Sequence, residues 1–94
     1  MLSELPRSLK GLAGTDVDKE VLRVGLIAEL DAINLYEQLA AAATNKTVKK
    51  VLADIAREEK THVGEFQALL LQLDKEQEEE LRAGKKEVDE LKSA

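Results

Sequence analysis

Two long stretches without a helix breaker dominate this sequence, and a very short connection separates them. The only proline is Pro6, so residues 16–43 and 46–73 each form an uninterrupted helical pattern, because proline is the residue that a helix interior tolerates least. Between them stand Thr44 and Asn45, a β-branched residue and one that often caps a helix. Such a short connection predicts that the two helices fold back as an antiparallel hairpin.

Shorter segments flank the expected hairpin. Residues 1–15 contain Pro6, Gly11 and Gly14, which predicts an irregular lead segment with Thr15 as the N-cap of the first long helix. Asp74 is followed three residues later by Gln77, which predicts another cap and a short C-terminal helix over residues 74–92. This last helix has few apolar residues, so we expect it to be mainly solvated. The sequence predicts one all-α domain over residues 1–94.

Composition narrows the classes of function. The chain has no Cys, which excludes disulfides, cysteine-bound metals and a thiol nucleophile. Its formal charge of −5 repels phosphate backbones, and Tyr36 and Phe66 are the only aromatic residues, so nucleic acid is not an expected partner. There is no signal-peptide pattern and no run of 18 apolar residues, so we expect no membrane span and a cytoplasmic location.

Two carboxylates and the only histidine interrupt the apolar seams of the two long helices. Alternate steps of four and three residues along the second helix give Val48, Leu52, Ile55, Glu59, His62, Phe66, Leu69 and Leu73. The same stepping along the first helix gives Leu22, Gly25, Glu29, Ala32, Tyr36, Leu39 and Ala43. A carboxylate on such a seam is unfavourable unless it is paired, neutralised or bound to a metal.

The spacing favours a metal. Glu59 and His62 are three residues apart and therefore share a helix face, while Glu29 and Glu59 each lie fourteen residues from their ends of the connection. At about 1.5 Å per residue, both glutamates fall roughly 21 Å from the turn, at the same level of an antiparallel hairpin. One Glu and one Glu-x-x-His are half of a di-metal carboxylate site. We therefore expect two chains, related by a two-fold axis, to complete a four-helix bundle.

The charges of such a site balance. Four glutamates from two chains carry −4 and two divalent cations carry +4, with two neutral imidazoles as further ligands. Carboxylate-rich sites with one histidine per ion suit iron or manganese, and zinc remains an option.

Each of these residues also has a simpler interpretation. The Glu-x-x-His pair is compatible with an ordinary solvated face, and His62 with a core histidine bonded to Glu58 or Glu59. Tyr36 either contributes to the site or only packs in the seam. Gly25 predicts close helix approach at the dimer axis. Four acids beside the seams are either guides for cations or ordinary surface groups: Asp31, Glu37, Glu58 and Glu65.

Two segments carry a resemblance to a known family. The runs ELDAINLYEQ, residues 29–38, and AREEKTH, residues 56–62, resemble the ferritin-like superfamily and, more narrowly, the encapsulated ferritins. The resemblance implies that Glu29, Glu59 and His62 are the ferroxidase ligands. It also implies that Tyr36 is the neighbouring tyrosine and that Asp31 lies on the iron access route. Ala28 and Leu35 depart from the family pattern, which has an acid and an aromatic residue there.

The resemblance also implies a function. Members of the family oxidise Fe(II) with O₂ or peroxide at a two-iron centre between two chains, and their homodimers assemble into rings of five dimers, a decamer. The oxidised iron is stored by an encapsulin shell, which implies a location inside an encapsulin nanocompartment. The alternative is a non-enzymatic helical assembly module with a structural metal site.

Overall fold

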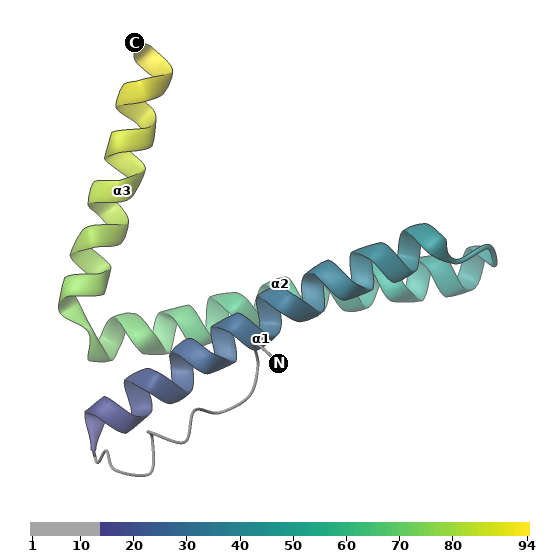
Figure 1. Cartoon of the computed structure of the whole chain (residues 1–94), viewed down its shortest axis with the longest axis horizontal. Coiled ribbons are helices and arrows are strands. Elements are labelled where there is room, and N and C mark those ends of the chain that lie inside the picture. The colour runs from purple at the N-terminus through teal and green to yellow at the C-terminus, as the bar shows by residue number, and fades with distance from the viewer. Residues whose placement is uncertain (1–13) are drawn as a thin grey trace.

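The computed structural model describes residues 14–94, and all of its secondary structure is helical. Helix α1 spans Thr15–Ala42, α2 spans Lys46–Leu73 and α3 spans Lys75–Ser93. Helices α1 and α2 run side by side in opposite directions, whereas α3 leaves the hairpin steeply (Figure 1). The expected all-α fold with an antiparallel hairpin is confirmed. The irregular segment expected before Gly14 lies outside the described residues.

The helix ends differ from expectation at one place. Thr15 is already helical, and the N-cap position belongs to Gly14, which makes no side-chain cap hydrogen bond. Gly14 has a φ of 66°, a backbone conformation that glycine adopts without strain. The prediction of Thr15 as the N-cap is therefore wrong, because the glycine turns the chain one residue earlier.

The connection between α1 and α2 is closed by Asn45, as its residue type predicts. The Asn45 side-chain oxygen accepts hydrogen bonds from the backbone N–H groups of Thr47 and Val48, at 2.9 and 3.0 Å. Lys49 Nζ donates to the carbonyl oxygens of Ala40 and Ala41 near the end of α1. Both helix ends at the turn thus have partners for part of their backbone groups.

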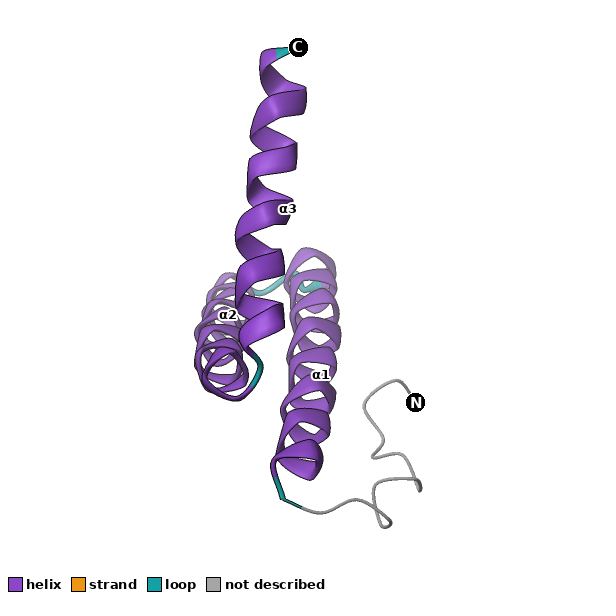
Figure 2. Cartoon of the chain, turned by 90° about the vertical axis from the view of Figure 1, so that its left-hand side faces the viewer, coloured by secondary structure: helices purple, strands orange, loops and turns teal. Residues whose placement is uncertain are grey.

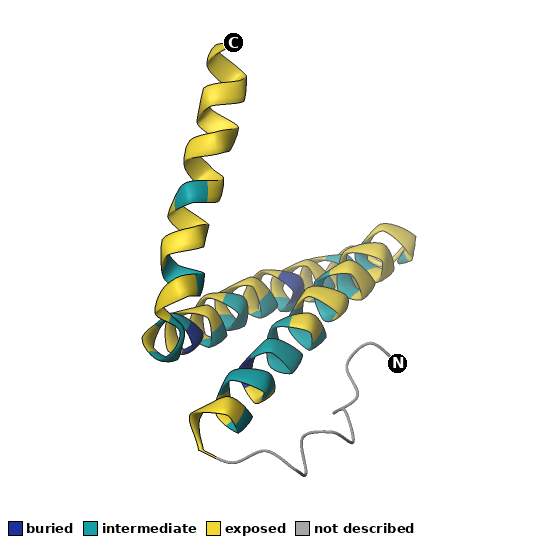
Figure 3. Ribbon diagram, turned by 60° about the vertical axis from the view of Figure 1, so that its left-hand side comes forward, coloured by how far each residue is buried: buried dark blue, intermediate teal, exposed yellow. Residues whose placement is uncertain are grey.

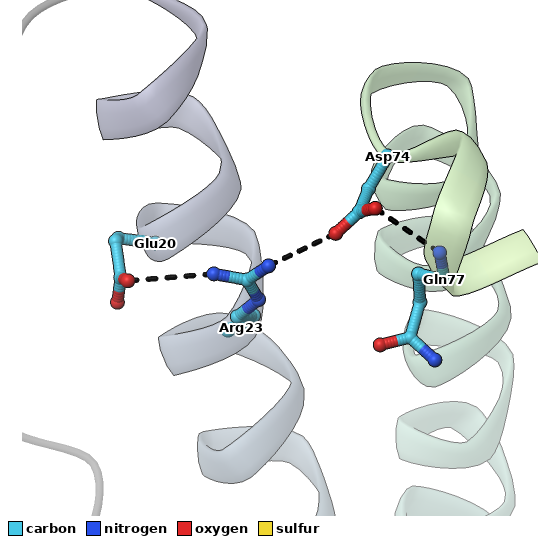
Figure 4. A network of polar contacts seen from close by, with 4 residues as sticks. All are labelled: Glu20, Arg23, Asp74 and Gln77. Carbon is cyan, nitrogen blue, oxygen red and sulfur yellow. Dashed lines mark hydrogen bonds and ion pairs between the residues drawn. The ribbon is translucent and has the colours of Figure 1, made fainter. Parts of the chain in front are cut away.

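The junction between α2 and α3 is tied to α1 by one ion pair. Arg23 Nη2 donates to Asp74 Oδ2 at 2.9 Å, and Arg23 Nη1 lies 3.4 Å from Glu20 Oε1 (Figure 4). Asp74 Oδ1 accepts from the backbone N–H of Gln77, so the same side chain caps α3. Seen along the hairpin, α3 rises away from both long helices (Figure 2).

A single chain buries very little. Among the described residues only Leu22, Ala56 and Leu70 are less than a tenth exposed, and α3 has no buried residue (Figure 3). On one side of the hairpin, here called the open face, Val21 of α1 and Leu69 of α2 line the same groove, and they are 43% and 50% exposed. No helix in residues 14–94 is long and apolar enough to cross a membrane.

Candidate metal centre

Three side chains converge near the middle of the hairpin. Glu29 comes from α1, and Glu59 and His62 come from successive turns of α2. One potential ligand atom from each residue lies within 4.8 Å of the other two. His62 Nδ1 is 3.2 Å from Glu59 Oε2 and 3.5 Å from Glu29 Oε1. The structure thus brings together the three residues that spacing alone selected, and we call them the carboxylate-histidine cluster.

The cluster is partly shielded from water. The side chains of Glu29 and Glu59 are 18% and 19% exposed, whereas that of His62 is 44% exposed. Glu29 Oε2 is buried and has no hydrogen-bond partner among the described residues. A buried carboxylate oxygen without a partner is unfavourable and favours the binding of a cation.

A close contact between the helices sets the level of the cluster. A Cβ atom added to Gly25 would lie 2.8 Å from Cε1 of Phe66, so only glycine leaves room for this ring. Gly25 precedes Glu29 by four residues and Phe66 follows His62 by four, so the contact lies one turn from the cluster on each helix. The sequence predicted that Gly25 allows close helix approach at a dimer axis. The structure shows this close approach between α1 and α2 of one chain instead.

Two of the predicted site residues lie apart from the cluster. Tyr36 is half-buried two turns beyond Glu29, and within residues 14–94 no hydrogen bond joins its hydroxyl group to the cluster. Asp31 is exposed, and it does not belong to the group of candidate ligands. Their roles in the site therefore remain predictions.

The acids beside the seams differ in their surroundings. Glu37 accepts a hydrogen bond from Lys60 Nζ across the hairpin at 3.1 Å. Glu65 lines a cavity together with Glu29 and His62. The sequence placed Glu65 only among four acids beside the seams. That Glu65 lines this cavity depends on the shape of the folded surface, which the sequence pattern does not show.

The donor set fits a divalent cation of the first transition series. Two carboxylates and one imidazole can hold one such ion, and oxygen-rich sets with one nitrogen suit iron and manganese. Three protein donors leave further coordination positions open for a second chain, water or substrate. Four carboxylates from two copies balance the charge of two divalent ions.

Comparison with known proteins gives consistent matches. The family model for rubrerythrin matches residues 20–93. A ferritin-like-encapsulin shell fusion protein from Pyrococcus furiosus is 62% identical over 72 residues, covering 77% of this chain and 21% of that protein. The encapsulin nanocompartment cargo protein EncC from Myxococcus xanthus is 41% identical over 56 residues, covering 60% of this chain and 43% of that protein. The chain thus spans about a fifth of the first relative and less than half of the second.

A solved structure matches over most of both chains. The crystal structure of the encapsulated ferritin domain from Pyrococcus furiosus has a TM-score of 0.83 and 54% sequence identity to this chain. The match covers 88% of this chain and 85% of that one.

Proposed function

The chain belongs to the encapsulated ferritins of the rubrerythrin family, and from this membership we propose that it is a ferroxidase that oxidises Fe(II) to Fe(III). The observation that carries the proposal is the convergence of Glu29, Glu59 and His62, with ligand atoms within 4.8 Å of one another. The unpartnered Oε2 of Glu29 supports it, because this oxygen lacks the hydrogen bond that a purely structural carboxylate would need.

The proposed active form is a dimer. One chain supplies two carboxylates and one imidazole, which is half of a di-metal carboxylate site. The open face exposes apolar side chains of both long helices, so a second copy on this face would bury them while it completes the site. By family membership we extend the proposal to a ring of five dimers.

In the proposed reaction, two Fe(II) ions are the substrates. Each gives up one electron, and the two electrons reduce one molecule of O₂ to peroxide or one molecule of peroxide to water, with two protons consumed. Glu29, Glu59 and His62 hold the ions close together, and the negative charge of the carboxylates stabilises the higher charge of Fe(III). The protein's contribution is therefore to position the ions and to stabilise the oxidised metal. Tyr36 is proposed as a neighbouring group in electron transfer.

We also propose that this chain acts inside an encapsulin compartment. The names of its relatives describe a protein fused to an encapsulin shell and cargo proteins of encapsulin nanocompartments. We propose that the Fe(III) formed by this chain is stored by the shell.

Titration with Fe(II) in air tests the proposed function. Absorbance of Fe(III) and protein-bound metal are followed together, and a ferroxidase is expected to turn over more than two iron ions per dimer. Binding of two ions without further turnover would instead support the alternative, a structural metal site in a helical assembly module. Replacing Fe(II) by Zn(II), which is redox-inert, separates binding from oxidation.

A further inference from the structure

A close contact between α1 and α2 lies directly beside the carboxylate-histidine cluster. A Cβ atom built on Gly25 would lie 2.8, 3.0 and 3.1 Å from Cε1, Cδ1 and Cζ of Phe66. Three atoms of one ring thus occupy the place of a side chain at position 25. The two helices approach this closely only because α1 has a glycine there.

This contact is in register with the cluster. Glu29 follows Gly25 by four residues on α1, and His62 precedes Phe66 by four residues on the antiparallel α2. Residues four apart lie one above the other on the same face of a helix. Glu29 Oε1 and His62 Nδ1, which are 3.5 Å apart, therefore lie one turn beyond the contact at Gly25. A change in helix separation at the contact reaches this pair of ligands.

The Phe66 ring also borders the ligands directly. Glu29, His62 and Phe66 line one common space. Long side chains on a helix lean toward its N-terminus, so the ring leans along α2 toward His62. A ring that is pushed aside therefore moves into the surroundings of the ligands, whereas a ring that stays in place moves α1 and, with it, Glu29.

Attraction between the ligands does not fix their separation before metal binds. The distance of 3.5 Å between Glu29 Oε1 and His62 Nδ1 is too long for a strong hydrogen bond. The carboxylates of Glu29 and Glu59 repel each other. The packing of Phe66 against α1 is therefore the contact that sets the distance between the helices at this level.

We propose that Phe66 is a positioning residue. Its ring, seated against Gly25, holds Glu29 at the separation from Glu59 and His62 that a divalent ion needs. The inference rests on the proposed function, because it concerns the ligands of the same centre. Phe66 has no donor atom and binds no metal itself, so it acts through the spacing of the ligands, as outer contacts of metal sites do. The contact lies within one chain, so the assembly of two chains does not remove it.

Binding of Co(II) tests this role without relying on oxidation. Metal-free, assembled protein is titrated with Co(II), and the visible absorption of the bound ion reports the arrangement of its ligands. Gly25→Ala should bind Co(II) about tenfold more weakly, with a changed spectrum, because loss of an outer contact typically costs roughly 10- to 100-fold in affinity. Phe66→Leu leaves a gap beside Gly25 and should also weaken binding. The double variant Gly25→Ala/Phe66→Leu should recover most of the affinity and the wild-type spectrum, because the added methyl group fills the space that the ring vacates.

Two control variants separate spacing from stability. Gly64→Ala adds the same methyl group to α2, two residues after His62, where no atom lies within 4 Å. Leu22→Ala removes buried packing from α1 without adding an atom beside Phe66. Both should keep the wild-type Co(II) spectrum and affinity. All variants are compared at protein concentrations at which native mass spectrometry shows full assembly, so that affinity does not report association of the chains.

Several results would overturn the role of Phe66. A wild-type Co(II) spectrum and affinity in Gly25→Ala would do so, as would a double variant that binds no better than Gly25→Ala. An equal change in Leu22→Ala would assign the effect to stability alone and would also reject the role.

Other results separate this inference from the proposed function. Wild-type protein that binds Co(II) but does not oxidise Fe(II) would reject the proposed ferroxidase alone, and the comparison of spectra would still decide the role of Phe66. A Glu59→Ala variant that binds Co(II) with the wild-type spectrum would reject the metal centre and the inference together.

Discussion

At the scale of single residues, the contact between Gly25 and Phe66 determines how close the two helices come. The ring occupies the space that any Cβ at position 25 would need, and it lies one turn from the carboxylate-histidine cluster. A shift at this contact therefore changes the distances between Glu29 on α1 and its two partners on α2.

Substitution of two glycines with alanine separates the effect of this contact on stability from the effect of helix propensity. Gly64→Ala should stabilise the protein by about 1 kcal/mol, because no atom lies near the added Cβ and alanine is the better helix former. Gly25→Ala gains the same propensity but meets Phe66, and overpacking costs about 1–3 kcal/mol. We expect a net loss of up to about 2 kcal/mol in urea unfolding at fixed protein concentration. Equal stabilisation by both substitutions would contradict the close contact, and Phe66→Leu should relieve the loss in Gly25→Ala.

The three cluster residues should act as one unit. Each occurs twice in the proposed dimer, so alanine at Glu29, Glu59 or His62 removes two ligands. Each single variant should lose most of the rapid Fe(II) oxidation, and the triple variant should be little worse, as for groups that act together. Initial rates and bound iron are the measurements. Wild-type oxidation by Glu59→Ala would reject the di-iron assignment.

At the scale of elements, Asp74 links all three helices. It follows the last residue of α2, caps α3 through Gln77 and pairs with Arg23 of α1. The backbone hydrogen bond from Gln77 lowers the pKa of the Asp74 carboxyl group, and Arg23 lowers it further, while burial opposes both. This one ionised side chain therefore contacts α1 and caps α3 at the point where α3 leaves the hairpin.

The lowered pKa predicts a loss of order in α3 at acid pH. Because the pKa of Asp74 is lower in the folded state than in the unfolded state, its stabilising contribution is complete above the unfolded pKa and disappears as pH falls through the folded pKa. Hydrogen exchange at the first amides of α3 should therefore accelerate in this acidic range. Asp74→Asn keeps a good capping residue but has no charge to lose, so its exchange should lack this pH-dependent step. The same acid response in both proteins would assign the effect to other groups.

At the scale of the whole molecule, the single chain has an incomplete hydrophobic core. Three buried residues and an apolar open face leave much of the hairpin in contact with water. A chain of about this size buries only roughly 60% of its unfolded surface even when it is compact. In the proposed dimer, a second copy supplies both the missing burial and the missing ligands.

Assembly should depend on metal. In the proposed dimer four carboxylates face one another, so the metal-free form is opposed by repulsion and desolvation. Zn(II) or Fe(II) should raise the oligomer fraction in native mass spectrometry and should raise Tm. A ligand at 100 times its Kd stabilises the form that binds it by about 2.7 kcal/mol. Acidification from pH 8 to pH 5 should weaken the effect, because protons compete for the ligands.

Glu59→Gln is the control for this dependence. It keeps the shape of the side chain and removes two negative charges per dimer, so its metal-free dimer should be more stable than that of the wild type. Its oxidation of Fe(II) should be lost. A wild-type protein that assembles and melts identically with and without metal, across pH 5 to 8, would mean that these carboxylates do not meet at an interface.

Local periodicity was sufficient to predict the helices and the composition of the cluster. Helix bounds follow from the distribution of breakers and caps, and Asn45 and Asp74 both cap as their residue types indicate. The common level of Glu29 and Glu59 follows from equal distances to the turn, because the rise per residue of a helix is constant. These inferences need only interactions between residues that are close in sequence or joined by one short connection.

Tertiary structure decided the features that depend on distant contacts. The buried positions of α2 are Ala56 and Leu70, each one residue beyond an expected seam position, because packing against a single helix centres the contact differently from packing in a full bundle. The contact of Gly25 with Phe66 and the place of Glu65 beside Glu29 and His62 also depend on how the helices pack. The ion pair between Arg23 and Asp74, 51 residues apart, joins α1 to the start of α3. No periodic pattern encodes such a pair, because it forms only after the hairpin has brought the two helices together.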